Sequence, residues 1–159
     1  MNPGFSRRGF TILEVIIVLA VIMVVSLVTA PLGLQFYNGQ TIAGIQGQIG
    51  DTLTRARSQS VAQKGDDQYG ICLNQNGIYT QTFVLYKGAA GAACSSHNTS
   101  YDESYQVLGN TIVYLPASST EISFAKHTGK PTATGTVSII WNGLMRTLTV
   151  DSFGTIVQN

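Results

Sequence analysis

Residues 9–22 read GFTILEVIIVLAVI, and this stretch decides how the rest of the chain is organised. The apolar run that begins at Phe10 continues to Leu34, and no Lys, Arg, Asp or Glu occurs between Val15 and Gly50. A helix needs about 20 apolar residues to cross the hydrocarbon core of a bilayer. The sequence therefore predicts that residues 10–34 form a transmembrane helix.

Two arginines set the expected orientation of this helix. Arg7 and Arg8 directly precede the apolar run, and basic residues beside a membrane helix favour the cytoplasmic side. The run exceeds the ~7–15-residue core of a cleaved secretory signal, and no A-x-A cleavage pattern follows it. We therefore expect a single-pass anchor in the cytoplasmic membrane, with its N-terminus inside and its C-terminal part outside.

Glu14 is the unusual residue of the segment, because it places a carboxylate in the first turn of an apolar helix. A charge at the centre of a membrane helix costs about 2.5–3.5 kcal/mol on insertion scales, and such residues usually serve a function. The alternative is a plain signal anchor in which Glu14 extends its carboxylate to the cytoplasmic interface.

The composition argues against several classes of protein. Charged residues make up 11% of the 159-residue chain and the formal net charge is +1, whereas a typical globular domain has about 25% charged residues. This suits an exported protein rich in turns and hairpins, and there is no basic excess to attract nucleic acid. Without residues 1–9, seven of the nine basic residues remain against eight acidic ones.

Cys72 and Cys94 are the two cysteines, and both follow the apolar run. An even count in a segment expected outside the membrane favours a disulfide. Closing a loop of about twenty residues would contribute on the order of 3 kcal/mol in the chain-entropy model. Two buried free thiols are the alternative.

Residues 35–64 are predicted to continue the helix as an amphipathic half. Pro31 lacks an amide proton and should bend or locally melt the helix before it. One face is apolar or small and the other polar, and the helix is expected to end near Lys64-Gly65. The predicted buried face is Ile42, Ile45, Ile49, Leu53, Ala56 and Ser60, and the polar face is Gln46, Gln48, Asp51, Arg55 and Arg57.

Residues 65–159 show short β runs separated by turn signals. The clearest hairpin has Asn142-Gly143 at its turn, which suits a type I′ conformation, and Asn74–Gly77 indicates another. The expected strands are 69–73, 78–87, 107–115, 121–124, 137–141, 145–150 and 155–157. A long helix followed by a series of strands predicts an α+β fold, with an antiparallel sheet covering one helix face.

The sequence offers no pattern for catalysis or metal binding. His97 and His127 stand beside Lys, Ser, Thr or Asn instead of an acid and a nucleophile, and no C-x-x-C or H-x-x-x-H spacing occurs. Residues 128–132 lack the upstream glycine of a phosphate loop. We expect no enzyme activity, metal or cofactor. Four acids are interpreted as solvated turn charges, with cation binding as the alternative: Asp66, Asp67, Asp102 and Glu103.

The GFTILE string, the preceding arginines and the full-length apolar run together resemble the class III leader and helix of type IV pilins and pseudopilins. The resemblance implies that a membrane prepilin peptidase cuts between Gly9 and Phe10 and that Phe10 becomes the N-methylated N-terminus. Glu14 would then be the fifth residue of the mature chain, where it could pair with the Phe10 amine of a neighbouring subunit. Pro31 matches a position where many pilins carry a kinking proline.

Residues 53–62, LTRARSQSVA, and the closing runs GTVSIIWNG and DSFGTI are similar to the GspH/FimT-type pseudopilin domain. This resemblance implies a minor subunit of a type IV pilus or type II secretion filament. Its partners would be other subunits, the peptidase, an inner-membrane assembly platform and, before assembly, lipid. The mature subunit would end in a periplasmic or extracellular filament.

Two alternatives to a filament subunit stay open. Some FimT-like proteins bind DNA during uptake through basic residues late in the domain. Here only Arg146 lies after Lys130, and residues 155–159 carry no cation, so the pattern gives little support to nucleic acid as a partner. The other alternative is an uncleaved, membrane-anchored exported domain with a different role.

Overall fold

The computed structural model describes residues 9–62, 67–88, 94–97, 99–116 and 119–159, without the side chains of residues 28–32 and 76. The chain divides into two compact units, Met1–Tyr37 and Asn38–Asn159. The predicted leader, residues 1–9, lies outside the described residues except for Gly9.

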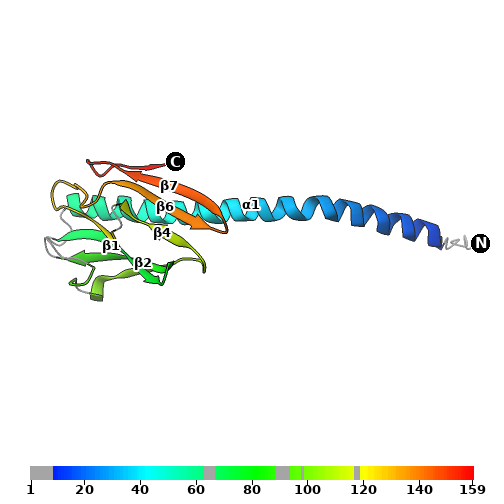
Figure 1. The fold of residues 1–159 in the computed structure, drawn as a ribbon, viewed down its shortest axis with the longest axis horizontal. Helices are drawn as coiled ribbons and strands as arrows, with labels where there is room; N and C mark the ends of the chain where they lie inside the picture. The colour runs from blue at the N-terminus through cyan, green and yellow to red at the C-terminus, as the bar shows by residue number, and fades with distance from the viewer. Residues whose placement is uncertain (1–8, 63–66, 89–93, 98, 117–118) are drawn as a thin grey trace, which may run out of the picture. The chain divides into compact units, whose positions relative to one another are not determined.

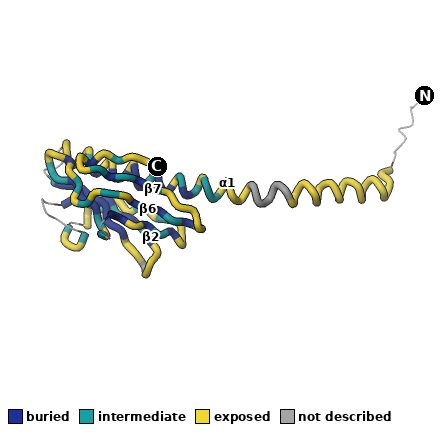
Figure 2. The backbone as a smooth tube through the Cα atoms, turned by 45° about the horizontal axis from the view of Figure 1, so that its top comes forward, coloured by how far each residue is buried: buried dark blue, intermediate teal, exposed yellow. Residues whose placement is uncertain are grey.

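One helix, α1 (Ile12–Val61), supplies residues to both units (Figure 1). In the first unit every residue from Gly9 to Leu27 is exposed (Figure 2). Among the described residues, no helix combines the length and apolarity that a membrane crossing requires. The membrane-spanning role of residues 10–34 stays a prediction. The bend at Pro31 also stays a prediction, because α1 is helical at this position but the side chain is not described.

The second unit contains two antiparallel sheets of four strands each (Figure 1). The first sheet has the order β3-β2-β1-β5, and the second has the order β4-β6-β7-β8. The first sheet comprises β1 (Gln68–Asn76), β2 (Tyr79–Gly88), β3 (Glu103–Gln106) and β5 (Glu121–Phe124). The second comprises β4 (Ile112–Tyr114), β6 (Gly135–Trp141), β7 (Leu144–Val150) and β8 (Ile156–Gln158). A 3-10 helix, η2 (Thr99–Tyr101), precedes β3.

The predicted antiparallel fold is confirmed, but the prediction of one sheet is wrong. Strand β4 follows β3 in the chain, yet it pairs with β6 in the other sheet. Alternating apolar residues show which face of a strand is buried, but they do not show which strand it pairs with.

Two strand predictions also need correction. The expected strand 107–115 is reduced to β4, because residues 108–111 turn: Thr111 N–H bonds the Leu108 carbonyl and Asn110 has φ of 65°. Strand β3 was not predicted, since its Glu-Ser-Tyr-Gln sequence shows no apolar alternation. By contrast, Asn142 and Gly143, with φ of 48° and 77°, form the turn between β6 and β7 as predicted for type I′ geometry.

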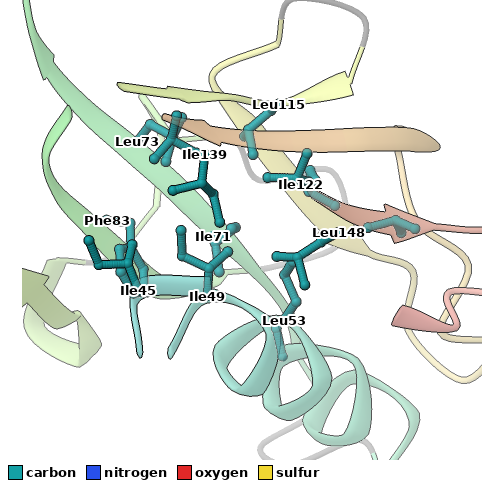
Figure 3. Packing of buried hydrophobic residues seen from close by; sticks show 14 of the residues in the cluster. Ile45, Ile49, Leu53, Ile71, Leu73, Phe83, Leu115, Ile122, Ile139 and Leu148 are labelled. Carbon is teal, nitrogen blue, oxygen red and sulfur yellow. The ribbon is translucent and has the colours of Figure 1, made fainter. Parts of the chain in front are cut away.

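The core lies between α1 and both sheets (Figure 3). All six residues predicted for the buried helix face are 6% exposed or less: Ile42, Ile45, Ile49, Leu53, Ala56 and Ser60. Ile71 and Ile122 from the first sheet, and Ile139 and Leu148 from the second, are fully buried in the same cluster. Burying a Leu or Ile side chain of this kind contributes about 1.5–3 kcal/mol.

Gln46 was predicted to lie on the polar face of the helix, but it is buried. It is 6% exposed, and its side-chain amide donates to the carbonyls of Thr147 at 2.8 Å and Asn159 at 3.1 Å. A buried amide is tolerated when its donors are satisfied, and here Gln46 ties α1 to β7 and the residue that follows β8.

Gly70 in β1 is a position where a side chain cannot fit. An added Cβ would lie 2.7 Å from the Ile122 carbonyl oxygen, 2.8 Å from Ser123 Cα and 2.8 Å from the ring of Tyr86. Two of these atoms belong to the backbone of β5. The close pairing of β1 with β5 therefore depends on glycine at this position.

We predict that Gly70→Ala lowers the free energy of unfolding by about 1–3 kcal/mol, since overpacking would push β1 and β5 apart. Urea unfolding of a fragment of residues 38–159 measures this, because every residue of the buried apolar core belongs to that unit. Gly109→Ala is the control: nothing lies within 4 Å of its added Cβ, and its stability should change by less than about 0.5 kcal/mol. Equal effects of the two substitutions would contradict the packing argument.

Candidate assembly and processing site

The predicted processing residues lie at the start of α1. Gly9 and Phe10 precede the helix, and Phe10 is 82% exposed. The Glu14 amide donates to the Thr11 carbonyl at 3.1 Å and to Thr11 Oγ1 at 3.3 Å. Thr11 is therefore the N-cap of α1, and Glu14 is the third residue of its first turn.

Thr11 and Glu14 have the spacing of a capping box, in which a Glu side chain at this position can return to the N-cap amide. Sequence reasoning missed this role, although the Thr-x-x-Glu signal was present. The structure shows no partner for the Glu14 carboxylate among the described residues. Glu14 borders a hollow of about 270 Å³ whose other lining residues are apolar: Phe10, Val15, Val18 and Leu19.

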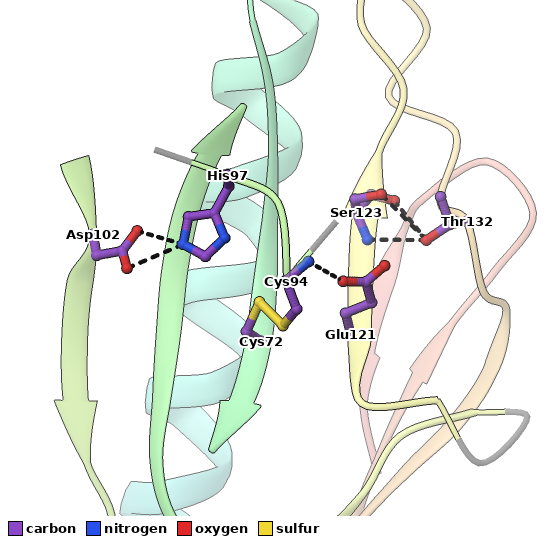
Figure 4. The surroundings of a disulfide bond; sticks show 7 residues. All are labelled: Cys72, Cys94, His97, Asp102, Glu121, Ser123 and Thr132. Carbon is purple, nitrogen blue, oxygen red and sulfur yellow. Dashed lines mark hydrogen bonds and ion pairs between the residues drawn. A yellow bond between two sulfur atoms is a disulfide. The ribbon is translucent and has the colours of Figure 1, made fainter. Parts of the chain in front are cut away.

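Cys72 and Cys94 form a disulfide, with their Cα atoms 5.7 Å apart (Figure 4). The pairing expected from the sequence is therefore present. Cys72 belongs to β1, and the Cys94 amide donates to the carboxylate of Glu121 in β5. The disulfide and this hydrogen bond thus attach Cys94 to β1 and β5, which are neighbouring strands of the first sheet.

His97, three residues after Cys94, lies against Tyr86, a fully buried residue of β2. The His97 ring lies 4.9 Å from the Tyr86 ring, and His97 Nε2 lies 2.9 Å from Asp102 Oδ1 (Figure 4). Burial, the largest cause, raises the pKa of Tyr86 to about 12. The disulfide at Cys94 and the His97–Asp102 pair together hold the His97 ring against Tyr86.

The expectation that Asp102 and Glu103 are merely solvated turn charges is wrong. Asp102 pairs with His97, and the Glu103 carboxylate accepts two hydrogen bonds from the Arg55 guanidinium at 2.6 and 2.7 Å. Asp67 likewise pairs with Lys87 at 3.0 Å, whereas Asp66 lies outside the described residues. Arg55 and Lys87 are far from Glu103 and Asp67 in sequence, so no local pattern indicates these two pairs.

Three of the described residues place possible metal ligands close to one another. Cys72, Cys94 and Glu121 bring three candidate ligand atoms within 4.8 Å of one another. Both sulfur atoms are joined in the disulfide, and a thiolate is the form of cysteine that binds metals. While the disulfide is intact, the Glu121 carboxylate is the one metal ligand that these three residues can offer.

The end of α1 is held by two turns of the second unit. Ser60 Oγ accepts from the Tyr69 amide at 2.9 Å, and the Ser60 carbonyl accepts from the His127 amide at 3.3 Å. Arg57, which the sequence places on the polar face of the helix, is half-buried and donates to the Phe153 carbonyl at 3.1 Å. The Leu-x-x-Ala-Arg-Ser run therefore joins the helix to the sheets.

The turn that Arg57 contacts is organised by Asp151. One Asp151 carboxylate oxygen accepts from the Phe153 amide at 2.8 Å and from the Thr155 amide at 2.7 Å. The hydrogen bond from the Thr155 backbone is the largest cause that lowers the Asp151 pKa, and the Arg57 charge acts in the same direction. The turn is therefore held by an ionised carboxylate.

The comparisons with known proteins address both units. Residues 4–30 match the prokaryotic N-terminal methylation motif. No curated protein matches the chain in sequence. The crystal structure of the type IV minor pilin FimU from Pseudomonas aeruginosa is similar, with a TM-score of 0.60 over 78% of this chain and 92% of that one, at 14% sequence identity. The chain thus combines the methylation motif with a type IV pilin-like α+β fold.

We predict that replacing both cysteines, Cys72→Ser with Cys94→Ser, lowers the free energy of unfolding of residues 38–159 by about 2–4 kcal/mol. The reason is the loss of a link across 22 residues of sequence. Urea unfolding without reductant measures the change. Adding a reductant should bring the unmodified fragment to the same stability, and a midpoint that does not move in either case would contradict the prediction.

We also predict that the effect of Asp151→Ala on stability depends on pH. A carboxylate whose folded pKa lies below its ordinary value of 3.8 stabilises the fold above that pH. The contribution is lost as pH falls through the lowered folded pKa. Unfolding curves of residues 38–159 should therefore differ between Asp151 and Ala more at pH 7 than at pH 3.

Asp151→Asn is the matched variant for this measurement. Asn keeps an oxygen that can accept from the Phe153 and Thr155 amides, but it does not titrate. Its stability relative to Ala should change less with pH than that of the unmodified protein. A difference between Asp151 and Ala that stays constant from pH 7 to pH 3 would show that the ionised carboxylate does not hold the turn.

Proposed function

We propose that this chain is a minor subunit of a type IV pilus or of a type II secretion-type filament, processed by prepilin peptidase and assembled through α1. The observation that carries the proposal is the occurrence of two features in one chain. The methylation motif covers residues 4–30, and 78% of the chain takes part in a fold similar to that of a type IV minor pilin. Neither feature alone would distinguish a filament subunit from another anchored domain.

Processing would remove residues 1–9 and leave Phe10 as the new N-terminus. The exposed, non-helical position of Gly9 and Phe10 supports this step, because a peptidase needs an accessible backbone ahead of the helix. Cleavage before α1 keeps the apolar residues attached to the globular unit. The subunit would thus stay in the inner membrane, N-terminus in, until the assembly platform takes it up.

The apolar half of α1 requires a nonaqueous environment. Its side chains are exposed around the whole helix, from Val15 at 47% to Leu27 at 77%. A helix that is apolar on every side belongs in a membrane or in the interior of an assembly. Lipid before assembly and α1 helices of other pilin subunits afterwards would both supply it.

Glu14 would give this packing its register. Cleavage creates an amine at Phe10, which stays cationic after methylation, and the Glu14 carboxylate has no partner among the described residues. Pairing the two charges between neighbouring subunits removes the cost of two unpaired charges in an apolar interior. The competing role is local, since Glu14 stands at the position from which a capping-box carboxylate can reach the Thr11 amide.

We predict that the chain recovered from producing cells begins at an N-methylated Phe10. Intact-mass measurement of the purified full-length product tests this directly. An N-terminus at Met1 would overturn the proposed processing and favour an uncleaved, membrane-anchored domain. The same sample, taken from a sheared filament fraction, shows whether the processed chain enters a filament.

We predict that Glu14→Gln and Glu14→Ala both reduce the amount of the chain in sheared filaments by at least about tenfold, equivalent to about 1.4 kcal/mol. Gln is accepted at this position of a capping box, so it preserves the local role and removes only the charge. Cleavage at Gly9 should continue in both variants. Normal incorporation of the Gln variant with loss of the Ala variant would assign Glu14 to capping instead of charge pairing.

A further inference from the structure

Strand β2 contains a bulge at Gln81. The register of β1 with β2 shifts at this point, so Gln81, between Thr80 and Thr82, has no partner in β1. Its carbonyl instead accepts from the Val107 amide at 3.0 Å, on the other side of the strand. A bulge redirects a side chain and is often found beside a binding or active site. The space next to Gln81 is therefore a candidate binding site.

The turn that follows β3 forms the other side of this space. Besides the bond at Gln81, the Thr111 carbonyl accepts from the Thr80 amide at 2.8 Å, which attaches the turn to β2 a second time. Asn110 lies between the two attachments and has φ of 65°. Residues other than glycine adopt this left-handed conformation rarely, and mostly where the surrounding structure imposes it. The backbone on both sides of the space is thus fixed before a ligand binds.

The bulge and the turn border a hollow of about 500 Å³. This volume lies within the range of about 300–1,000 Å³ that small-molecule sites occupy. No charged residue lines the hollow, which sets it apart from a site for an ion or a phosphate. The lining residues that carry a hydroxyl or a primary amide are Tyr79, Thr80, Gln81, Thr82, Gln106 and Asn110.

Three primary amides border this hollow from three segments: Gln81 in β2, Gln106 at the end of β3 and Asn110 in the turn. All three residues are exposed, and their side chains make no hydrogen bond within the part of the chain that the structure describes. By contrast, the amides of Gln46 and Gln75 donate to backbone carbonyls at 2.8 and 3.3 Å. A primary amide has two N–H donors and one carbonyl acceptor. The hollow therefore offers a ligand several neutral donors and acceptors.

Two other lining residues add to this chemistry. Tyr79 is 42% exposed, and its ring supplies an apolar surface with a polar hydroxyl at one end. Thr80 is only 1% exposed, and its hydroxyl accepts from the Val113 amide at 3.2 Å. A hydroxyl has one donor as well as its acceptor sites, so Thr80 still has a proton to donate. The hollow thus combines one aromatic ring with amides and hydroxyls.

We propose that this hollow binds a neutral saccharide. Neighbouring hydroxyls of a sugar ring both donate and accept, as the side-chain amides do, and the C–H groups of the ring match the apolar surface of Tyr79. A charged ligand would lose its hydration here without gaining an opposite charge. The inference goes beyond the proposed function and does not depend on it, because every residue that carries it belongs to the unit Asn38–Asn159.

The test is an NMR titration of the full-length, nitrogen-15-labelled chain in a zwitterionic detergent. Detergents with sugar headgroups are avoided, because they would compete for the hollow. The probes are the neutral disaccharides N,N′-diacetylchitobiose, lactose and maltose, which differ in their acetamido groups and ring hydroxyls. At least one of them should shift the side-chain amide signals of Gln81, Gln106 and Asn110 in a saturable manner.

Two substitutions remove single amides without disturbing the backbone. Gln81→Ala and Asn110→Gly should each weaken binding by about fivefold to tenfold, as expected for the loss of a hydrogen bond. Glycine accepts the left-handed conformation of residue 110 without strain. Gln40→Ala is the matched control, since Gln40 is an exposed amide on α1 that does not line the hollow. The urea unfolding midpoint should stay the same in all three variants, which separates loss of binding from loss of the fold.

The absence of saturable shifts with all three disaccharides would overturn the inference. Equal binding by the unmodified chain and both hollow variants would overturn it as well. Tetraglycine, titrated in parallel, represents an uncharged peptide, and shifts with tetraglycine but with no disaccharide would assign the hollow to peptides instead. None of these results bears on cleavage before Phe10 or on entry into filaments, so the proposed function is tested separately.

Discussion

Burial of one face of α1 against two sheets is the interaction on which the globular unit depends. Ile49, Leu53 and Ala56 have no exposed surface, and each sheet supplies fully buried residues to the same cluster. Neither sheet could be stable alone, because an isolated sheet needs another layer to cover its apolar face. The polar contacts of the helix, from Gln46 to Ser60, then fix the position at which both sheets attach.

Much of this arrangement could be read from periodicity. The spacing of Ile42, Ile45, Ile49 and Leu53 indicates a single buried helix face, and Asn142-Gly143 identifies its hairpin, because both signals are local. The division of the strands into two sheets cannot be read from local sequence. It depends on β4 pairing with β6 instead of with β3, and β3 itself is an edge strand whose polar sequence gives no apolar signal.

The candidate site likewise has features that follow from local sequence and features that only the fold creates. The positions of Gly9, Phe10 and Glu14 follow from a contiguous motif, and the pairing of Cys72 with Cys94 follows from there being two cysteines. The roles of Arg55 and Arg57 could not be predicted, since their partners Glu103 and Phe153 lie in other segments and only the fold brings them together. Glu14 shows a third case: its capping signal was in the sequence but was overlooked in favour of its unusual charge.

The contacts of α1 with residues 158 and 159 have a consequence for the timing of folding. Gln46 bonds the Asn159 carbonyl across 113 residues of sequence, and the open side of Gly50 faces the Gln158 side chain. Both contacts need residues 158 and 159. The second sheet can therefore complete its packing on the helix only after the chain from residue 46 to residue 159 is free to fold.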